Sequence, residues 1–129
     1  MNYGAIFYNG FGYYDDSDVS SGTIIITPEE GARVARAMGD KYACLLRGHG
    51  VVTGAENIPQ LVLDTILLTK NAEVQLSIEA AGKEPKLTTS EEGRAYRKIM
   101  HADNALLRCW NYYVERAKKA MPDIRDLQG

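Results

Sequence analysis

The chain has 129 residues, of which 45% are hydrophobic, so it is long enough to fold as one domain with a real core, and nothing in it indicates a second domain. Fifteen basic and seventeen acidic residues give a formal net charge of −2, without a concentrated basic block. This balance argues against nucleic acid or an anionic membrane as the main partner and favours a small molecule or another protein.

The start of the chain, from Met1, has neither a basic leader nor a sustained apolar segment. No apolar run approaches the roughly 20 residues that a membrane span needs, and we therefore expect a cytoplasmic protein. Cys44 and Cys109 fall in a predicted core strand and a core-facing helix. That placement is typical of reduced thiols buried as small hydrophobic groups, rather than of a disulfide framework.

Residues 1–21 are rich in Gly, Asn, Tyr and Asp and show no helical or alternating pattern, which predicts an irregular or extended arm. Its aromatic side chains should pack on the rest of the domain or on a neighbouring subunit. These side chains are Tyr3, Tyr8, Tyr13 and Tyr14. Asp15, Asp16 and Asp18 lack the glycine and downstream glutamate of a calcium loop, so we interpret them as a solvated acidic turn.

The next segment predicts a strand, a helix and a second strand. Residues 23–26 are β-branched and predict a strand. Thr27, Pro28 and Glu30 then supply a helix N-cap, a proline in the first turn and a capping-box glutamate. The helix should run to Met38, with Gly39 as its C-cap, before a strand over residues 42–46.

Residues 43–54 place His49 between Gly48 and Gly50, with apolar runs on both sides. This pattern predicts a buried strand, a tight turn and a return strand. The two glycines permit torsions or close approaches that hold the imidazole at a fixed point. His49 is therefore a candidate functional residue, and the alternative is an imidazole that caps the turn by bonding to backbone.

A long helix is predicted from residue 56 or 57 to Gly82, with Pro59 in its first turn and enough apolar residues to be largely buried. A second capping signature, at Thr88 or Thr89, begins a last helix that runs to about residue 119. As one straight rod this helix would be about 46 Å long against a compact diameter of ~36 Å, so it must bend or project. A projecting stripe that includes Trp110 predicts a homo-oligomer.

The leucine-leucine and histidine-glycine turn at 45–50, followed by residues 55–59 and the helix ending at 68–76, resembles the C-terminal half of the class II aldolase/adducin family. The likeness is good over about 22–82 and weaker to about 119. It implies an α/β fold with a partly antiparallel central sheet flanked by helices, incomplete because the family's N-terminal strands are absent. Residues 1–129 would form one partial domain, with an irregular arm at 1–21, a core with the metal turn at 22–82 and a helical region at 88–121.

The resemblance makes His49 a metal ligand, most often to zinc, with manganese or cobalt as alternatives. The family takes its two other ligands from an upstream His-x-His pair, which this chain lacks. Neither Cys44 nor the second histidine, His101, can be placed beside His49 from sequence spacing. A glutamate that the family carries on the following helix is replaced by Thr69, while Asp64 and Glu73 on the same helix are interpreted as ordinary polar-face residues.

Three further residues have weaker claims to a site. Arg47, beside the turn, is either a surface arginine or a group that binds a substrate carboxylate. Tyr112 and Tyr113 match the region from which family enzymes lend tyrosines to a neighbouring subunit, and the alternative for both is packing at an interface.

The function implied is a metal-dependent carbon-carbon lyase, present as a truncated or degenerate chain. It would perform retro-aldol cleavage or decarboxylation of a small hydroxy-carbonyl or carboxylated substrate, two reactions that share an enolate intermediate. The family also implies a tetramer. The alternative is a non-catalytic, adducin-like interaction or assembly module, and the absence of two of the three expected histidines favours that alternative for the chain as it stands.

Overall fold

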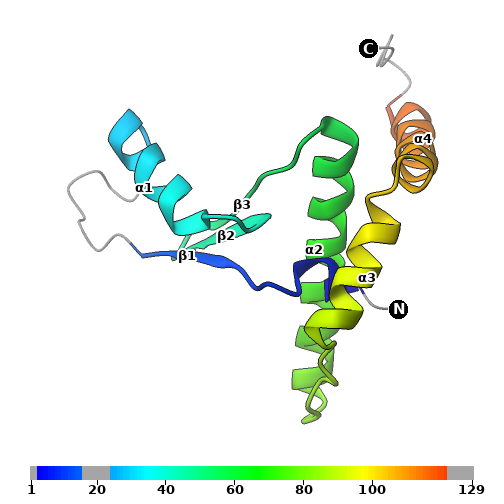
Figure 1. Cartoon of the computed structure of the whole chain (residues 1–129), viewed down its shortest axis with the longest axis horizontal. Coiled ribbons are helices and arrows are strands. Elements are labelled where there is room, and N and C mark those ends of the chain that lie inside the picture. Colours follow the sequence, from blue (N-terminus) through cyan, green and yellow to red (C-terminus); the bar gives the residue numbers. More distant parts are fainter. Residues whose placement is uncertain (1–2, 16–23, 122–129) are drawn as a thin grey trace.

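The computed structural model describes residues 3–15 and 24–121 of the chain. The 3-10 helix η1 and seven further elements follow one another in this order: η1 (Tyr3–Phe7), β1 (Gly12–Tyr14), α1 (Pro28–Met38), β2 (Ala43–Leu46), β3 (Gly50–Thr53), α2 (Ile58–Ala80), α3 (Ser90–Met100) and α4 (Asp103–Ala120). The three strands lie between α1 on one side and the group of α2, α3 and α4 on the other (Figure 1).

The sheet has the order β1-β2-β3 and is mixed. β1 pairs with β2 in parallel, with Gly12 opposite Cys44, whereas β2 pairs with β3 antiparallel, with Cys44 opposite Val52. The predicted α/β fold with a partly antiparallel sheet and flanking helices is thus confirmed. The predicted strand, turn and return strand around His49 are confirmed as β2 and β3.

Helix α1 begins and ends where its capping signals predict. The Thr27 hydroxyl accepts a hydrogen bond from the Glu30 N–H at 3.2 Å, and the Glu30 carboxylate accepts one from the Thr27 N–H at 2.9 Å. Gly39 ends the helix at a φ of 60°, in the left-handed region that favours glycine. Both signals are local, so the sequence alone is enough to place this helix.

The strand predicted at residues 23–26 is wrong where the structure describes it, at Ile24 to Ile26. The Ile26 N–H donates to the Glu30 carboxylate at 2.9 Å, so this backbone serves the cap of α1 and not a sheet ladder. Ile24 and Ile26 are 61% and 72% exposed. β-Branched composition favours a strand only where a neighbouring strand can pair with it.

The irregular arm predicted for residues 1–21 is also wrong over the part described, since η1 and β1 lie within it. Ala5, Ile6 and Phe7 are buried in the core, in contact with α2 and α3. The close fit is clearest at Gly93 of α3, where a Cβ atom would overlap Tyr8. From the sequence, Asp15, Asp16 and Asp18 are interpreted as a solvated acidic turn. Asp15 forms an ion pair with Arg47, and the other two aspartates lie outside the described residues.

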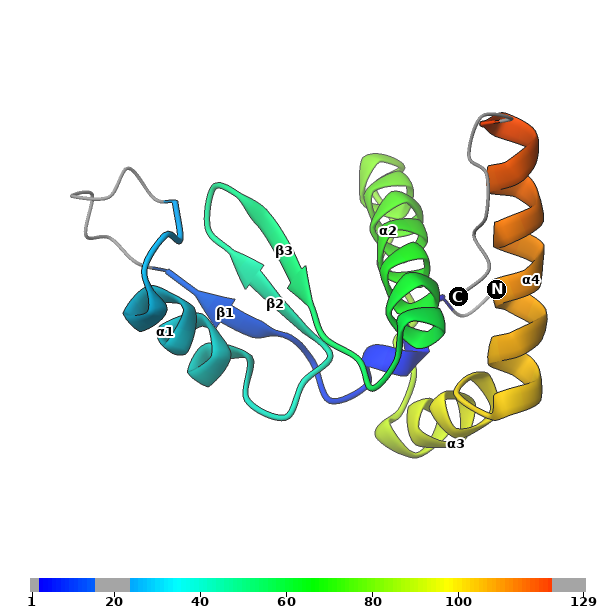
Figure 2. The same cartoon turned by 90° about the horizontal axis from the view of Figure 1, so that it is seen from above.

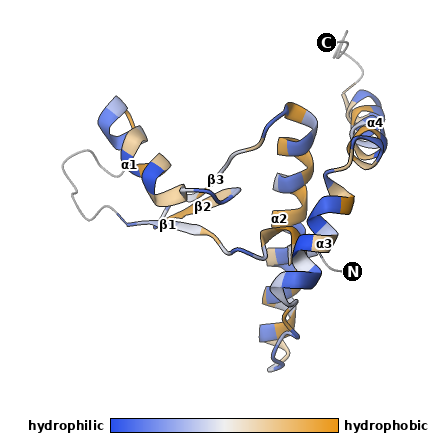
Figure 3. Cartoon of the chain, viewed as in Figure 1, coloured by the Kyte–Doolittle hydropathy of each residue, from blue (hydrophilic) through white to orange (hydrophobic). Residues whose placement is uncertain are grey.

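Helix α2 begins after the Asn57 cap and ends just before Gly82, as predicted, but it is not largely buried. Its buried residues lie in the first half, and Val74 and Leu76 in the second half are 42% and 65% exposed. Apolar residues are concentrated in the upper part of α2, beside α4, whereas the lower part is mixed (Figure 3). The other elements therefore bury residues only in the first half of this long helix.

The last helical region bends, which decides between the two predicted alternatives. α3 ends at Met100 and α4 starts at Asp103, with Ala102 in an extended conformation between them, and the two helices meet at a sharp angle (Figure 2). The bend lets Ala105 and Leu106 pack into the core while Leu107 and Tyr112 stay exposed. No helix in the described ranges is long and apolar enough to cross a membrane.

Because η1 belongs to the core, Ile6→Ala should lower the free energy of unfolding by about 2–5 kcal/mol through the cavity that it leaves. Ile24→Ala is the matched control, since this side chain is 61% exposed, and it should change the free energy by no more than about 0.5 kcal/mol. Urea denaturation monitored by circular dichroism measures both. Equal effects of the two substitutions would mean that residues 3–7 are a loose arm and not part of the core.

The N-terminal cap of α3 should make stability depend on acidic pH. The Thr89 N–H and hydroxyl both donate to the Glu92 carboxylate at 2.9 Å, which lowers the pKa of Glu92 below its ordinary value. A lowered folded-state pKa adds stability above the unfolded pKa of about 4.3, and that stability is lost as the pH falls through the folded value. We expect unfolding to become less pH-dependent in this range for Glu92→Gln and to keep its slope for Glu91→Gln, as measured by denaturation at a series of pH values.

Candidate functional site

His49 lies at the tip of the β2–β3 hairpin, in a turn formed by Arg47, Gly48 and His49. Gly48 and Gly50 have φ values of 74° and 137°, while a Cβ atom on either would meet nothing within 4 Å. The glycines are therefore needed for their backbone torsions and not for a close approach. They turn the chain so that the imidazole projects from the end of the hairpin.

The hydrogen bonds around His49 bear on the two sequence-based interpretations of its imidazole. Its backbone N–H donates to the Leu46 carbonyl at 3.1 Å and closes the turn. The side chain is exposed and makes no hydrogen bond to any residue that the structure describes. The turn is thus closed by a backbone hydrogen bond and not by the imidazole, so both ring nitrogens are available to a ligand.

In the part of the chain that the structure describes, other potential metal ligands do not gather around His49. Within residues 3–15 and 24–121, no group of three or more His, Cys, Asp or Glu side chains could hold a metal ion. Cys44 is fully buried in β2, and burial raises the pKa of its thiol, which disfavours the thiolate that would bind a metal. The described residues therefore offer His49 as one candidate ligand and do not by themselves fit a complete metal site.

Arg47 lies in the same turn, but its guanidinium is already engaged. Nη1 donates to Asp15 Oδ1 at 3.0 Å and to Oδ2 at 3.2 Å, and this carboxylate raises the pKa of Arg47. The Arg47 backbone N–H also donates to the Tyr14 carbonyl. The residue thus links the hairpin tip to the end of β1, and its side chain remains 65% exposed.

Tyr112 and Tyr113 do not reach His49 within one chain. Their rings meet edge to face at a centroid distance of 5.1 Å, and Arg116 lies over the Tyr112 ring. In both views α4 lies on the far side of α2 from the strands (Figures 1 and 2). A role for these tyrosines beside His49 requires a second subunit.

The sequence analysis missed a polar cluster between α2, α3 and α4. His101, at the junction of α3 and α4, has its Nε2 atom 2.9 Å from Asp64 Oδ1, and the Asp64 side chain is 1% exposed. The interpretation of Asp64 as a polar-face residue is wrong, whereas Glu73 is exposed and bonds to Lys70 as such a residue should. Tyr42, just before β2, places its ring 5.4 Å from that of His101.

One sequence signal could have revealed the cluster. Gln60, Leu63, Asp64 and Leu67 recur at the i, i+3, i+4, i+7 spacing of one helix face, and all four are buried. Two polar residues on an otherwise apolar helix stripe need partners from elsewhere in the fold. The partner of Asp64 is 37 positions away along the chain, so spacing alone could not identify it.

The sequence matches the family model described as Class II Aldolase and Adducin N-terminal domain over residues 1–76. The Meiotically up-regulated gene 14 protein of Schizosaccharomyces pombe is 33% identical over 101 residues, which cover 77% of this chain and 37% of that protein. The 3,4-dihydroxyphthalate decarboxylase of Arthrobacter keyseri is 34% identical over 61 residues, 47% of this chain and 25% of the relative.

A solved structure, the L-fuculose 1-phosphate aldolase of Glaciozyma antarctica, shares the fold with a TM-score of 0.71 at 21% identity. The match covers 95% of this chain and 44% of the aldolase. The chain thus spans well under half the length of each of these proteins.

The two histidines should differ sharply in their effect on stability. His101→Ala removes the hydrogen-bond partner of the buried Asp64 carboxylate and should lower the free energy of unfolding by about 2–3 kcal/mol. His49→Ala truncates an exposed imidazole that has no hydrogen-bond partner among the described residues, and it should stay within about 0.5 kcal/mol of the parent protein. Chemical denaturation of both variants makes the comparison, and an undiminished stability in His101→Ala would show that the pair contributes nothing to the fold.

Proposed function

The chain belongs to the class II aldolase and adducin N-terminal domain family, and on that premise we propose that it contributes the His49 hairpin to a metal-dependent carbon-carbon lyase site. The substrate would be a small hydroxy-carbonyl or carboxylated molecule. Two similar proteins are named as an aldolase and a decarboxylase, and both of these reactions cleave a carbon-carbon bond.

The observation that carries this proposal is the free imidazole at the hairpin tip. Histidine is the commonest metal ligand among side chains, and a ligand must keep a ring nitrogen free of other hydrogen bonds. His49 is exposed, unpaired within the described part of the chain and aimed by two glycine torsions.

A catalytic zinc site takes about three protein ligands and one open position. The described residues offer one, so the others must come from residues outside the described ranges or from another polypeptide. This requirement agrees with a homo-oligomer, for which the family resemblance suggests a tetramer. In such an assembly, Tyr112 or Tyr113 of one subunit could lie beside the hairpin of another, and Arg47 could bind a substrate carboxylate if it left Asp15.

A second candidate function is a non-catalytic interaction module, in which the fold serves assembly. The absence of a metal-binding cluster in the described residues favours it. Thr69 favours it too, because it stands where the family resemblance leads us to expect a glutamate. The Thr69 hydroxyl donates to the Thr65 carbonyl one turn away. Metal binding separates the two functions.

We expect the purified protein, after reconstitution with zinc, manganese or cobalt, to hold close to one metal ion per subunit. The ion should be lost in His49→Ala and retained in Cys109→Ser, which controls for adventitious binding by a partly exposed thiol. Elemental analysis after gel filtration gives the metal content and the oligomeric state together. No metal in any of the three proteins would reject the lyase and leave the interaction module.

A further inference from the structure

A polar cavity lies beside the Asp64–His101 pair, between α2, α3 and α4. Its volume is about 340 Å³, and it opens beside the junction of α3 and α4. The side chains that dominate its lining are Tyr42, Gln60, Arg94, Arg97, Lys98 and His101. Because hydrogen-bond donors and cations converge there, we propose that the cavity binds a small anion through a phosphate or carboxylate group.

The basic residues of the cavity come from one face of α3. Arg94, Arg97, Lys98 and His101 follow the i, i+3, i+4, i+7 spacing, and all four line the same cavity. The three permanent cations among them, Arg94, Arg97 and Lys98, repel one another unless negative charge lies between them. The spacing therefore presents a concentrated donor surface to one small volume.

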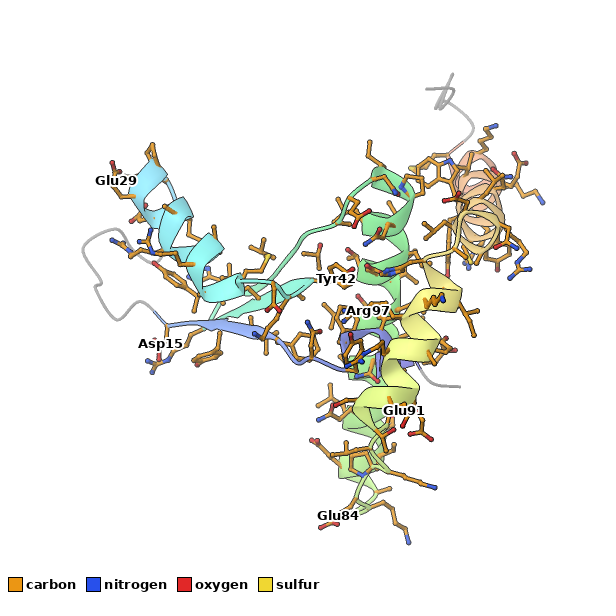
Figure 4. All side chains as sticks on the ribbon, in the orientation of Figure 1. Asp15, Glu29, Tyr42, Glu84, Glu91 and Arg97 are labelled. Atoms are coloured by element: carbon orange, nitrogen blue, oxygen red, sulfur yellow. The ribbon has the colours of Figure 1, made fainter. Side chains whose placement is uncertain are left out.

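Arg97 is held rigidly at the centre of this face. Its guanidinium is sandwiched between the rings of Tyr8 and Tyr42, at 4.3 and 4.4 Å from their centroids. Nε donates to the Ile6 carbonyl at 2.6 Å and Nη2 to Asn9 at 2.7 Å, which leaves Nη1 without a partner among the described residues. The close approach of Arg97 and Tyr42 is visible in Figure 4. A fixed guanidinium binds an oxyanion without losing side-chain freedom.

Gln60 gives an independent indication of a ligand. It lines the cavity, is 3% exposed, and its Nε2 atom has no hydrogen-bond partner within the described residues. A buried amide donor without an acceptor is unfavourable, so such groups are normally paired. An oxyanion in the cavity would supply the acceptor.

The helix termini add to the positive potential. The N-terminus of α2 contributes its cap residue Asn57, whose side chain accepts a hydrogen bond from the Gln60 N–H, and Gln60 itself. The first turn of α4 contributes Leu106 and Asp103, whose carboxylate offsets part of the positive potential of that terminus. Helix N-termini carry partial positive charge, and α4 has no capping side chain at Ala102 to satisfy its free N–H groups.

The charges in and around the cavity favour an anion over a cation. Glu56 and Asp103 also line it and are exposed, as are Arg94 and Lys98, so the lining holds two exposed carboxylates against three permanent cations. The buried Asp64 carboxylate is covered by His101, at 2.9 Å. A cation would thus meet arginine and lysine before any buried carboxylate, whereas a single phosphate or carboxylate group would meet donors.

Isothermal titration of the full 129-residue protein with inorganic phosphate and, separately, with malonate at constant ionic strength tests the proposal. We expect saturable binding of at least one anion, and the tighter of the two identifies the preferred group. Gln60→Met keeps the length of the side chain and removes the donor, so affinity should fall about tenfold. Arg94→Gln combined with Lys98→Gln should weaken binding several-fold, and Arg108→Gln, an exposed cation on α4 outside the cavity, should leave it unchanged.

Each variant is checked for folding by its thermal midpoint. Removing an unpaired buried amide does not lower stability by itself, so Gln60→Met should fold at least as well as the parent protein. The proposal is overturned if neither anion binds, or if Arg108→Gln weakens binding as much as the cavity variants do. Unchanged affinity in a folded Gln60→Met would likewise overturn it, because the Gln60 amide would then not bind the anion. Its acceptor would instead be the other unpaired buried atom, Asp64 Oδ2, one helical turn away.

Discussion

The fold depends on the position of one guanidinium group, that of Arg97. It joins three parts of the chain that have no direct covalent neighbourhood: the N-terminal helix through Ile6, the entrance to β2 through Tyr42, and α3 itself. The planar cation lies against the rings of Tyr8 and Tyr42. It also donates a hydrogen bond to the Ile6 carbonyl, which would otherwise lack a partner in the core. Through Tyr42, Arg97 thereby attaches the start of β2 to the helices α2, α3 and α4.

The free end of the hairpin follows from that attachment. β2 starts at a fixed point next to the helices, and the Thr53 and Thr65 hydroxyls, 3.0 Å apart, tie the end of β3 to α2. Between these anchors the hairpin extends away from the core and carries His49 at its tip. The imidazole is thus presented outward by rigid strands, which suits a site completed by residues from outside the described chain.

Features encoded by neighbouring residues could be predicted from the sequence, and features that depend on distant contacts could not. The capping box of α1 and the glycine-bounded turn at His49 are local, and both are found as expected. Residues 24–26 have strand composition but no partner strand within the described ranges. The sequence of η1 shows no pattern because its burial comes from α2 and α3. At the candidate site, the sequence identified His49, but the pairing of Asp64 with His101 needed the bend after α3, which brings a third helix to the same point.

The contact between Ile6 and Arg97 also constrains how the protein can be made. These two residues are 91 positions apart, so a ribosome must finish α3 before the N-terminal segment can find its place. Until then Ile6 and Phe7, which belong to the core of the folded chain, can be covered only by α2 and the segments before it. Segments synthesised first normally fold first, and here the earliest described segment must wait for one of the latest. These two apolar side chains therefore stay only partly covered until α3, which ends at Met100, has been made.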